Sequence, residues 1–273
     1  MTRDATKDVT KAATKPDPPH ALDHYRDAAY YDHAYRRYRD DLAFYVEMAT
    51  AFGGPILELG GGTGRISLAL ARAGHEVVMV ERMPSMLARA ARRLAKAPRA
   101  VRARVTTREG DLRALALGQT FPLVIGPFNV LQHLYTRDDV ERALRGVREH
   151  LAPGGRFAFD VLLPEPGAMS RDPSRFYKNR AILHPTTRQR SDYAEAFDYD
   201  HDTQILTTVI RFTPRDGGAP HYDRLTQRQF FPRELEALLH YNGFEILRHD
   251  GGFTGEPIDE LAESQVVLAR PRP

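Results

Sequence analysis

The sequence contains no cysteine among its 273 residues. Disulfide bonds, thiolate nucleophiles and cysteine-bound zinc are therefore excluded, and the composition fits a reducing compartment. No apolar run approaches the roughly 20 residues that a membrane-spanning helix needs. The first residues also lack the apolar centre of a secretory signal. We therefore expect a cytoplasmic protein with no membrane partner.

A strong excess of one charge sign is also missing. Lys and Arg together number 39, Asp and Glu number 36, and the formal net charge is +3. This small excess does not argue for a nucleic-acid partner. The densest basic run lies within residues 89–108, and without interleaved aromatic side chains it favours a solvated face over an RNA-binding surface.

The chain divides into a polar start and a long patterned remainder. Residues 1–19 hold almost no large apolar side chains, so we expect a disordered tail there. Residues 20–273 are expected to form a single domain. Its first part, residues 20–52, is rich in tyrosine and predicts a helical lid, with one helix at about residues 37–51 and a shorter one before it.

Short apolar runs alternate with amphipathic stretches from residue 55 to residue 162. Strands are predicted at residues 55–59, 76–81, 105–109, 123–128 and 156–162. Helices are predicted at residues 65–71, 84–97 and 137–151. Such alternation is typical of parallel strands joined by right-handed crossovers.

This alternation lapses after Pro164. Residues 164–230 contain period-two stretches such as residues 205–212, which favour antiparallel strands. A helix at residues 232–241 and strands near residues 245–249 and 265–269 follow, and the two strands would form a hairpin at the sheet edge. We therefore predict an α/β fold with a Rossmann-like, mostly parallel seven-stranded sheet and helices on both faces. The antiparallel insertion before the sixth strand would cover the substrate.

The first predicted strand ends in a glycine-rich turn, Leu59-Gly-Gly-Gly-Thr-Gly64. Glycines remove the Cβ atoms that would keep a ligand from the backbone, and they permit positive φ angles. The dinucleotide fingerprint Gly-x-Gly-x-x-Gly is not met, because neither frame, from Gly60 or from Gly62, has glycine at its sixth position. No Gly-Lys-Ser/Thr follows either, which excludes a Walker loop.

Acidic residues end the next two predicted strands. Glu81 ends the second strand, where a carboxylate can accept hydrogen bonds from two ribose hydroxyls. Asp111 follows the third strand, where a carboxylate can accept from an adenine amino group. Because an open α/β sheet places its ligand at the carboxyl ends of its strands, these residues and the glycine turn describe an adenosine-shaped site.

With these motifs, the sequence resembles the class I S-adenosylmethionine-dependent methyltransferases, in particular their bacterial small-molecule branch. The likeness runs from about Tyr25 to the C-terminus. It rests on the runs Gly54-Pro-Ile-Leu-Glu-Leu-Gly-Gly-Gly-Thr-Gly64, Leu70-Ala-Arg-Ala-Gly-His-Glu-Val77, Glu109-Gly-Asp111, Pro127-Phe-Asn-Val-Leu-Gln-His-Leu134 and Leu151-Ala-Pro-Gly-Gly155. The resemblance implies transfer of a methyl group from S-adenosylmethionine to a nitrogen or oxygen of a small-molecule metabolite, by in-line displacement, with S-adenosylhomocysteine as product.

The resemblance also implies a role for each matching position. Gly60, Gly62 and Gly64 would approach the methionine part of the cofactor, with Glu58 near its ammonium, and Glu81 would hold the ribose. The remaining implied contacts are Arg82 and Met83 beside the ribose, Asp111 and the backbone of Leu112 at the adenine, and Phe128 and Asn129 beside the reacting centre.

Three positions depart from the family pattern. Gly61 stands where members often have Cys or Ser, Glu81 replaces a commoner Asp, and Pro122 replaces an Asp often found before the fourth strand. We expect none of these changes to prevent cofactor binding, since Glu81 remains a diol acceptor.

Tyr31 and Tyr35 are the lid residues that we expect at the cofactor, because the resembling branch places a tyrosine-containing arm over it. A phenol could bind the cofactor carboxylate, and an aromatic face could meet the sulfonium. The other lid tyrosines are expected to pack the lid onto the sheet.

His133 follows the fourth predicted strand and is the candidate catalytic residue. Alignment in a dry pocket supplies much of the acceleration of methyl transfer, so a base is useful but not obligatory. A histidine pKa near neutrality suits removal of a proton from an amine or hydroxyl. His133 could equally only hydrogen-bond a loop carbonyl, and both interpretations stay open.

Two other functions also stay open: an RNA methyltransferase, and a non-catalytic regulatory protein that binds S-adenosylmethionine. A nucleic-acid partner is disfavoured by the charge pattern, and a small-molecule substrate is expected. His20 and His24 lack companions at metal-ligand spacing, so no metal is predicted.

Overall fold

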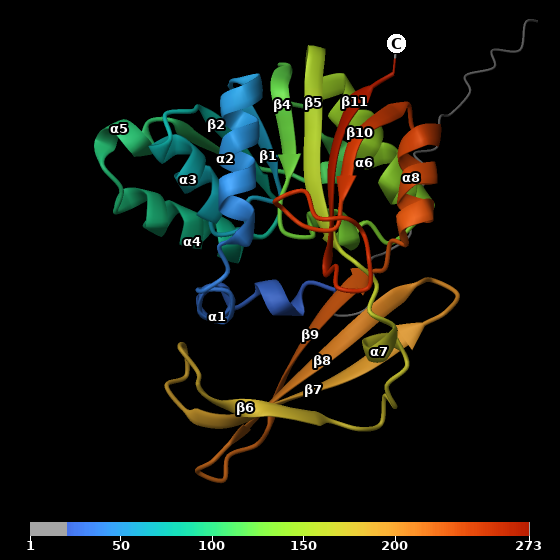
Figure 1. Ribbon diagram of the computed structural model, residues 1–273. Coiled ribbons are helices and arrows are strands. Elements are labelled where there is room, and N and C mark those ends of the chain that lie inside the picture. Colours follow the sequence, from blue (N-terminus) through green and yellow to red (C-terminus); the bar gives the residue numbers. More distant parts are fainter. Residues whose placement is uncertain (1–20, 273) are drawn as a thin grey trace, which may run out of the picture.

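The computed structural model describes residues 21–272, and the side chains of all of these except residues 178–180 (Figure 1). The expected disordered tail at residues 1–19 lies outside the described residues. Within the described part, no helix is both long enough and apolar enough to cross a membrane.

A seven-stranded sheet forms the centre of the molecule, in the order β10-β11-β5-β4-β1-β2-β3. Its parallel strands are β1 (Ile56–Leu59), β2 (Val77–Glu81), β3 (Val105–Glu109), β4 (Phe121–Gly126) and β5 (Leu151–Leu162). The antiparallel hairpin of β10 (Phe244–Asp250) and β11 (Ser264–Pro271) pairs with β5 through β11. The predicted fold class is confirmed, including the hairpin at the sheet edge.

Helices pack on both faces of this sheet (Figure 1). Helices α2 (Asp40–Phe52) and α3 (Arg65–Arg72) share one apolar core with Ile56, while α6 (Arg137–His150) and α8 (Pro232–Tyr241) share the other with Leu57. Neighbouring residues of β1 thus divide between the two cores, as the pleat of a strand buried on both faces requires. Helices α4 (Pro84–Ala95) and α5 (Arg99–Arg102) follow β2 in the chain.

Some element boundaries differ from the prediction. Strand β5 begins at Leu151 rather than residue 156, because Leu151 pairs with Phe121 ahead of an irregularity in the register. Pro122 lies at that irregularity, where the ladder is already interrupted and its missing N–H is tolerated. Helix α2 begins at Asp40 rather than residue 37, and α5 is an additional short helix.

A second sheet of four antiparallel strands lies beyond the carboxyl ends of the parallel strands (Figure 1). We call it the cover sheet. It consists of β6 (Tyr177–Leu183), β7 (Arg190–Asp200), β8 (Ile205–Pro214) and β9 (His221–Arg228), preceded by α7 (Pro166–Met169). These strands fall within the predicted insertion at residues 164–230. That the whole chain is one domain stays a prediction.

The lid contacts the cover sheet on one side and helix α4 of the main body on the other. It contains the 3₁₀ helix η1 (Asp23–Tyr25) and α1 (Ala28–Ala34), which lie between the cover sheet and the main body (Figure 1). Tyr30 packs against Phe212 of β8. On the other side, Asp32 accepts hydrogen bonds from Arg89 at 2.7 Å and Arg93 at 2.6 Å, both on α4. Two arginines of the basic run therefore hold the lid, which corrects the expectation of a wholly solvated face.

Candidate active site

A cavity opens at the carboxyl ends of β1 to β4, under the lid. Leu22 and Tyr25 of the lid form part of its wall. Ten predicted site residues line this cavity: Tyr31, Gly60, Gly62, Glu81, Arg82, Met83, Asp111, Leu112, Phe128 and His133. The chain thus brings most of the predicted site together from the lid and four strand ends.

The other four predicted residues lie nearby. Tyr35 and Glu58 line a second cavity, which shares Gly60 and Gly62 with the first and so continues it past the glycine turn. Gly64 lies in neither wall and is the N-cap of α3, and Asn129 lies next to Phe128 and is buried.

The glycine turn is shaped by crowding. Gly60 and Gly62 have φ angles of 60° and 55°, which favour glycine. A Cβ atom at Gly60 would overlap Val130, and a Cβ atom at Gly61 would overlap the side chain of Met79 on β2. The departure from the family pattern at Gly61 therefore has a structural cause, because buried Met79 occupies the space that a Cys or Ser side chain would need.

This crowding makes a testable prediction. We expect Gly61→Ser to lower the free energy of unfolding by about 1–3 kcal/mol through overpacking. Combining it with Met79→Val should cost less than the sum of the two single changes, because the smaller side chain makes room. Urea unfolding of the four proteins of this double-mutant cycle measures the coupling, and strictly additive costs would contradict the proposed clash.

Glu81 ends β2 with its carboxylate at the cavity wall, and the residue is 7% exposed. Its Oε2 accepts from the backbone N–H of Gly62 at 2.9 Å, and its Oε1 accepts from that of Met83 at 2.8 Å. Burial raises the pKa of Glu81, while these backbone donors oppose the rise. Each oxygen keeps further acceptor capacity, so a vicinal diol could donate both hydroxyls to this carboxylate.

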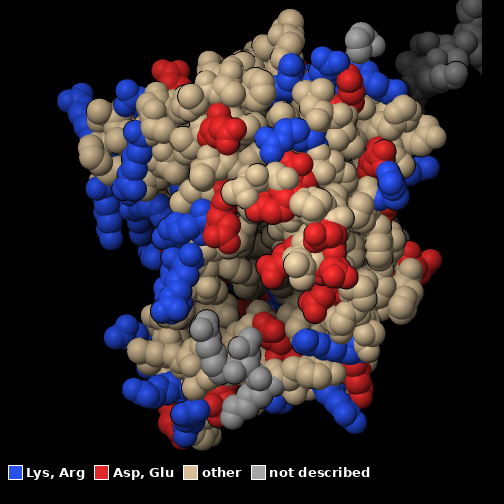
Figure 2. Space-filling view, in the orientation of Figure 1, with Lys and Arg blue, Asp and Glu red and all other residues tan. Residues whose placement is uncertain are grey.

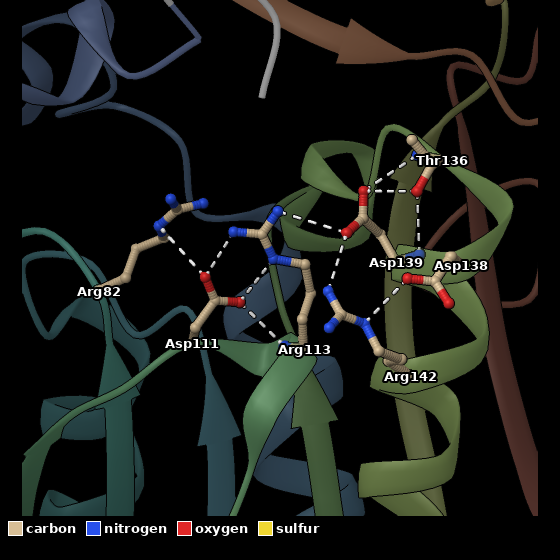
Figure 3. Close-up of polar contacts among 7 residues, drawn as sticks. All are labelled: Arg82, Asp111, Arg113, Thr136, Asp138, Asp139 and Arg142. Carbon is tan, nitrogen blue, oxygen red and sulfur yellow. Dashed lines mark hydrogen bonds and ion pairs between the residues drawn. The ribbon is translucent and has the colours of Figure 1, made fainter. Parts of the chain in front are cut away.

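Asp111 lies in a row of charged side chains that runs from the cavity to the start of α6 (Figure 3). Arg113 donates from Nε to Oδ1 at 3.0 Å and from Nη2 to Oδ2 at 2.7 Å, and Arg82 Nε lies 3.6 Å from Oδ2. Burial acts to raise the pKa of Asp111, but the hydrogen bonds and charge of Arg113 outweigh it and lower this pKa. The carboxylate is therefore a fixed, ionised acceptor.

The row continues beyond Arg113. Its Nη1 donates to Asp139 Oδ1 at 3.3 Å, and Asp139 forms a capping box with Thr136 at the start of α6 (Figure 3). The sequence predicted Asp111 at the site, but it gave no local sign that Arg113 binds both of its oxygens.

The loop after β4 is held by an acid that was not predicted. Phe128 and Asn129 have positive φ angles of 56° and 65°, and their backbone N–H groups donate to Asp160 of β5 at 2.8 and 3.2 Å. Tyr45 Oη donates to the same carboxylate at 2.6 Å. Burial raises the pKa of Asp160 to about 6. A lone Asp among the apolar residues 157–162 was the sequence signal for this residue.

Glu58 and Arg65 face the second cavity. Glu58 is buried, accepts from Ser67 Oγ, and has its pKa raised to about 8 by burial. Arg65 forms a two-pronged ion pair with buried Asp41, with N–O distances of 2.6 and 2.5 Å. Its guanidinium also lies 5.4 Å from the ring centre of Phe128. Glu58 can accept a hydrogen bond from a protonated amine here, while Arg65 is held in place by Asp41.

His133 lies in the 3₁₀ helix η3 (Val130–His133), directly after β4. Its Nε2 is 2.5 Å from Tyr25 Oη of the lid, and its Nδ1 is 3.2 Å from Tyr135 Oη. Both tyrosines also line the cavity. Tyr25 is missing from the residues predicted at the site, although it belongs to the tyrosine-rich lid segment.

Figure 2 shows the molecule hollowed between the main body and the cover sheet. Acidic side chains gather along one side of this hollow, and basic side chains gather on the flank formed by α3, α4 and α5. A cationic molecule that approached the hollow would therefore meet a favourable field.

Comparison with known proteins finds methyltransferases by family, by sequence and by structure. Residues 56–155 match the family described as a methyltransferase domain. The cypemycin N-terminal methyltransferase of a Streptomyces species is 27% identical over 79% of this chain and 82% of its own length. The CcbJ methyltransferase from Streptomyces caelestis has a TM-score of 0.77 at 25% identity, covering 92% of this chain and 98% of that one. The glycopeptide N-methyltransferase MtfA, in complex with S-adenosylmethionine, has a TM-score of 0.60 at 28% identity, covering 87% and 89%.

The family match lies within the seven-stranded sheet and its helices, the structural matches cover most of the chain, and both agree with the motif resemblance. The neighbour with bound S-adenosylmethionine identifies the cofactor of the fold. The chain is a class I S-adenosylmethionine-dependent methyltransferase, with S-adenosylmethionine as its cofactor.

Proposed function

We propose that this enzyme transfers the methyl group of S-adenosylmethionine to an amine nitrogen of a small molecule. The observation that carries the proposal is the hydrogen-bonded pair of His133 and Tyr25 in the wall of the cavity. Two of the proteins similar to this chain are named for methylation at an N-terminus or at nitrogen, which supports the same chemistry. The acidic side of the hollow suits a substrate that arrives as an ammonium ion (Figure 2).

The cavity residues fit the cofactor. We infer that Glu81 accepts from the ribose hydroxyls, since its carboxylate is fixed by two backbone donors and keeps acceptor capacity. Asp111 would accept from the adenine amino group beside the backbone of Leu112. Glu58 would face the ammonium of the methionine part, where a positive charge would favour its ionised form. Tyr31 would lie over the cofactor, because it lines both cavities.

The bound cofactor supplies a methyl group on a positively charged sulfur. The chain's own contribution begins with exclusion of water, since Leu22, Tyr25 and Tyr31 of the lid wall the cavity. It continues with alignment of the acceptor, which can supply much of the acceleration of a displacement reaction. Tyr25 Oη then accepts a proton from the substrate ammonium and passes its own proton to His133 Nε2, which frees the lone pair that attacks.

Nitrogen is favoured over oxygen by the strength of this base. A histidine near neutral pKa can deprotonate an ammonium, whose pKa is within a few units of its own. A neutral amine is then nucleophilic without further activation. An aliphatic hydroxyl would need a much stronger base or a specific activator. The RNA alternative loses support because Arg89 and Arg93 of the basic run are engaged by Asp32.

Matched acceptors test this proposal. Pairs of small molecules that differ only by an amino group or a hydroxyl at one position are incubated with enzyme and cofactor. We expect S-adenosylhomocysteine formation and a gain of one methyl mass with the amine member of a pair. Methylation of the hydroxyl member at an equal or higher rate would contradict the proposal, and so would methylation of RNA alone.

A further inference from the structure

The cover sheet is fastened to the segment that carries His133. Gln132 Nε2 donates to the backbone carbonyl of Arg228 at 3.0 Å, and its Oε1 accepts from Gln227 Nε2 at 3.1 Å. Tyr135 Oη lies 2.8 Å from Thr226 Oγ1 and 3.2 Å from the Thr226 carbonyl oxygen. Consecutive residues of β9 thus bind Gln132 and Tyr135, which lie on either side of His133 in the chain, and Gln132 and Thr226 are almost fully buried.

The protons available to these groups limit how the contacts can be made. The Thr226 carbonyl can only accept, so the contact at 3.2 Å requires the hydroxyl proton of Tyr135. Thr226 Oγ1 then donates its own proton to Tyr135 Oη. Tyr135 has no second proton for His133, so Nδ1 must carry the proton of its contact with Tyr135 at 3.2 Å. This is the arrangement in which all three contacts are hydrogen bonds.

The opposite side of the imidazole agrees with this arrangement. With its proton on Nδ1, neutral His133 has a lone pair on Nε2, and Tyr25 Oη at 2.5 Å can donate to it. Burial raises the pKa of Tyr25 well above its usual value, so this phenol stays protonated as a donor. In the reverse tautomer, Nδ1 carries no proton and its contact with Tyr135 needs the tyrosine hydroxyl proton. The Tyr135 oxygen and the Thr226 carbonyl oxygen would then face each other as two acceptors.

We propose that Tyr135 and Thr226 are positioning residues that fix the proton of His133 on Nδ1 and so keep its basic Nε2 turned toward Tyr25 in the cavity wall. The cover sheet therefore helps to set the chemistry of the site as well as to enclose it. The catalytic consequence rests on the proposed role of His133 as base. The tautomer itself does not rest on that role and can be measured separately.

Nuclear magnetic resonance of enzyme labelled with ¹⁵N-histidine tests the tautomer directly. Long-range ¹H–¹⁵N correlation distinguishes the protonated from the unprotonated ring nitrogen, and His133→Gln assigns the signals. We expect the proton on Nδ1 in the wild type and a shift toward the other tautomer in Tyr135→Phe. A wild-type proton on Nε2, or a tautomer unchanged in Tyr135→Phe, would overturn the proposal.

Variants of Thr226 provide a second test of the His133 tautomer in case Tyr135→Phe does not fold. Thr226→Val removes the 2.8 Å contact with little change in shape, whereas Thr226→Ser keeps the hydroxyl. We expect the proton to stay on Nδ1 in both variants, because the carbonyl oxygen of residue 226 still takes the proton of Tyr135. A proton on Nε2 in either variant would show that this carbonyl does not fix the tautomer, and would contradict the proposal.

Kinetics connect the tautomer to methyl transfer. We expect Tyr135→Phe to lower kcat about 10- to 100-fold with the KM for S-adenosylmethionine little changed, whereas Thr226→Ser should stay close to the wild type. If His133→Gln turned over at the wild-type rate, the role of His133 as base would fail. The measured tautomers would still decide whether Tyr135 and Thr226 position the ring.

Discussion

Replacing Glu81 with alanine is expected to weaken binding of S-adenosylmethionine and S-adenosylhomocysteine by at least about 100-fold. Each hydrogen bond from a ribose hydroxyl to an ionised carboxylate is worth about 1.5–3 kcal/mol, and about 1.4 kcal/mol corresponds to a tenfold change in affinity. The variant also leaves the backbone N–H groups of Gly62 and Met83 without their acceptor. Isothermal titration calorimetry with each ligand measures the loss.

Glu109 offers a matched control for this prediction. It pairs with Glu81 in the register of β2 and β3, yet it is exposed and lies outside the cavity wall. Glu109→Ala should therefore bind both ligands with nearly wild-type affinity. Glu81→Asp should lie between the two, because it keeps a carboxylate on a shorter side chain. Wild-type affinity in Glu81→Ala would contradict the ribose assignment.

The largest loss of stability is expected from Asp160→Ala. The substitution removes the acceptor of three donors, the N–H groups of Phe128 and Asn129 and the hydroxyl of Tyr45. Each buried donor left without a partner costs about 1–3 kcal/mol, so the free energy of unfolding should fall by at least about 3 kcal/mol. Urea unfolding measures this change. Asp202→Ala, at an exposed site after β7, is the control and should be close to wild type.

The pH dependence of stability gives a second signature of Asp160. Its pKa is about 6 in the folded protein, above the value near 4 of an unfolded chain, so the folded state binds this proton more tightly. The resulting contribution to stability is complete below about pH 4 and is lost as the pH rises through 6. We expect the stability of the wild type relative to Asp160→Asn to fall over this range and to level off above it. A pH-independent difference would contradict the raised pKa.

Features that depend on local pattern were predictable. The apolar runs with intervening amphipathic stretches fixed the order of strands and helices, and the carboxyl ends of parallel strands must meet at one edge of the sheet. The sequence therefore predicts Glu81 and Asp111 at one edge of the sheet, and both line the same cavity.

The missed features join segments that are distant in the chain. Tyr25 reaches His133 across 108 positions, and Arg89 reaches Asp32 across 57. Such pairs depend on how the lid packs over the finished sheet, and periodicity within a segment holds no information about that packing. Gly61 shows the same limit, because its departure from the family pattern was visible but its cause is Met79 on the neighbouring strand.

The central claim, methyl transfer to the nitrogen of a small molecule, is tested most directly with cofactor labelled with ¹³C at its methyl group. The enzyme is incubated with a metabolite extract, and the labelled products are examined by mass spectrometry and by ¹³C nuclear magnetic resonance, which distinguishes methyl groups on nitrogen from those on oxygen. We predict label in a small molecule as an N-methyl group. Label only as O-methyl, only in RNA, or in no product would contradict the account.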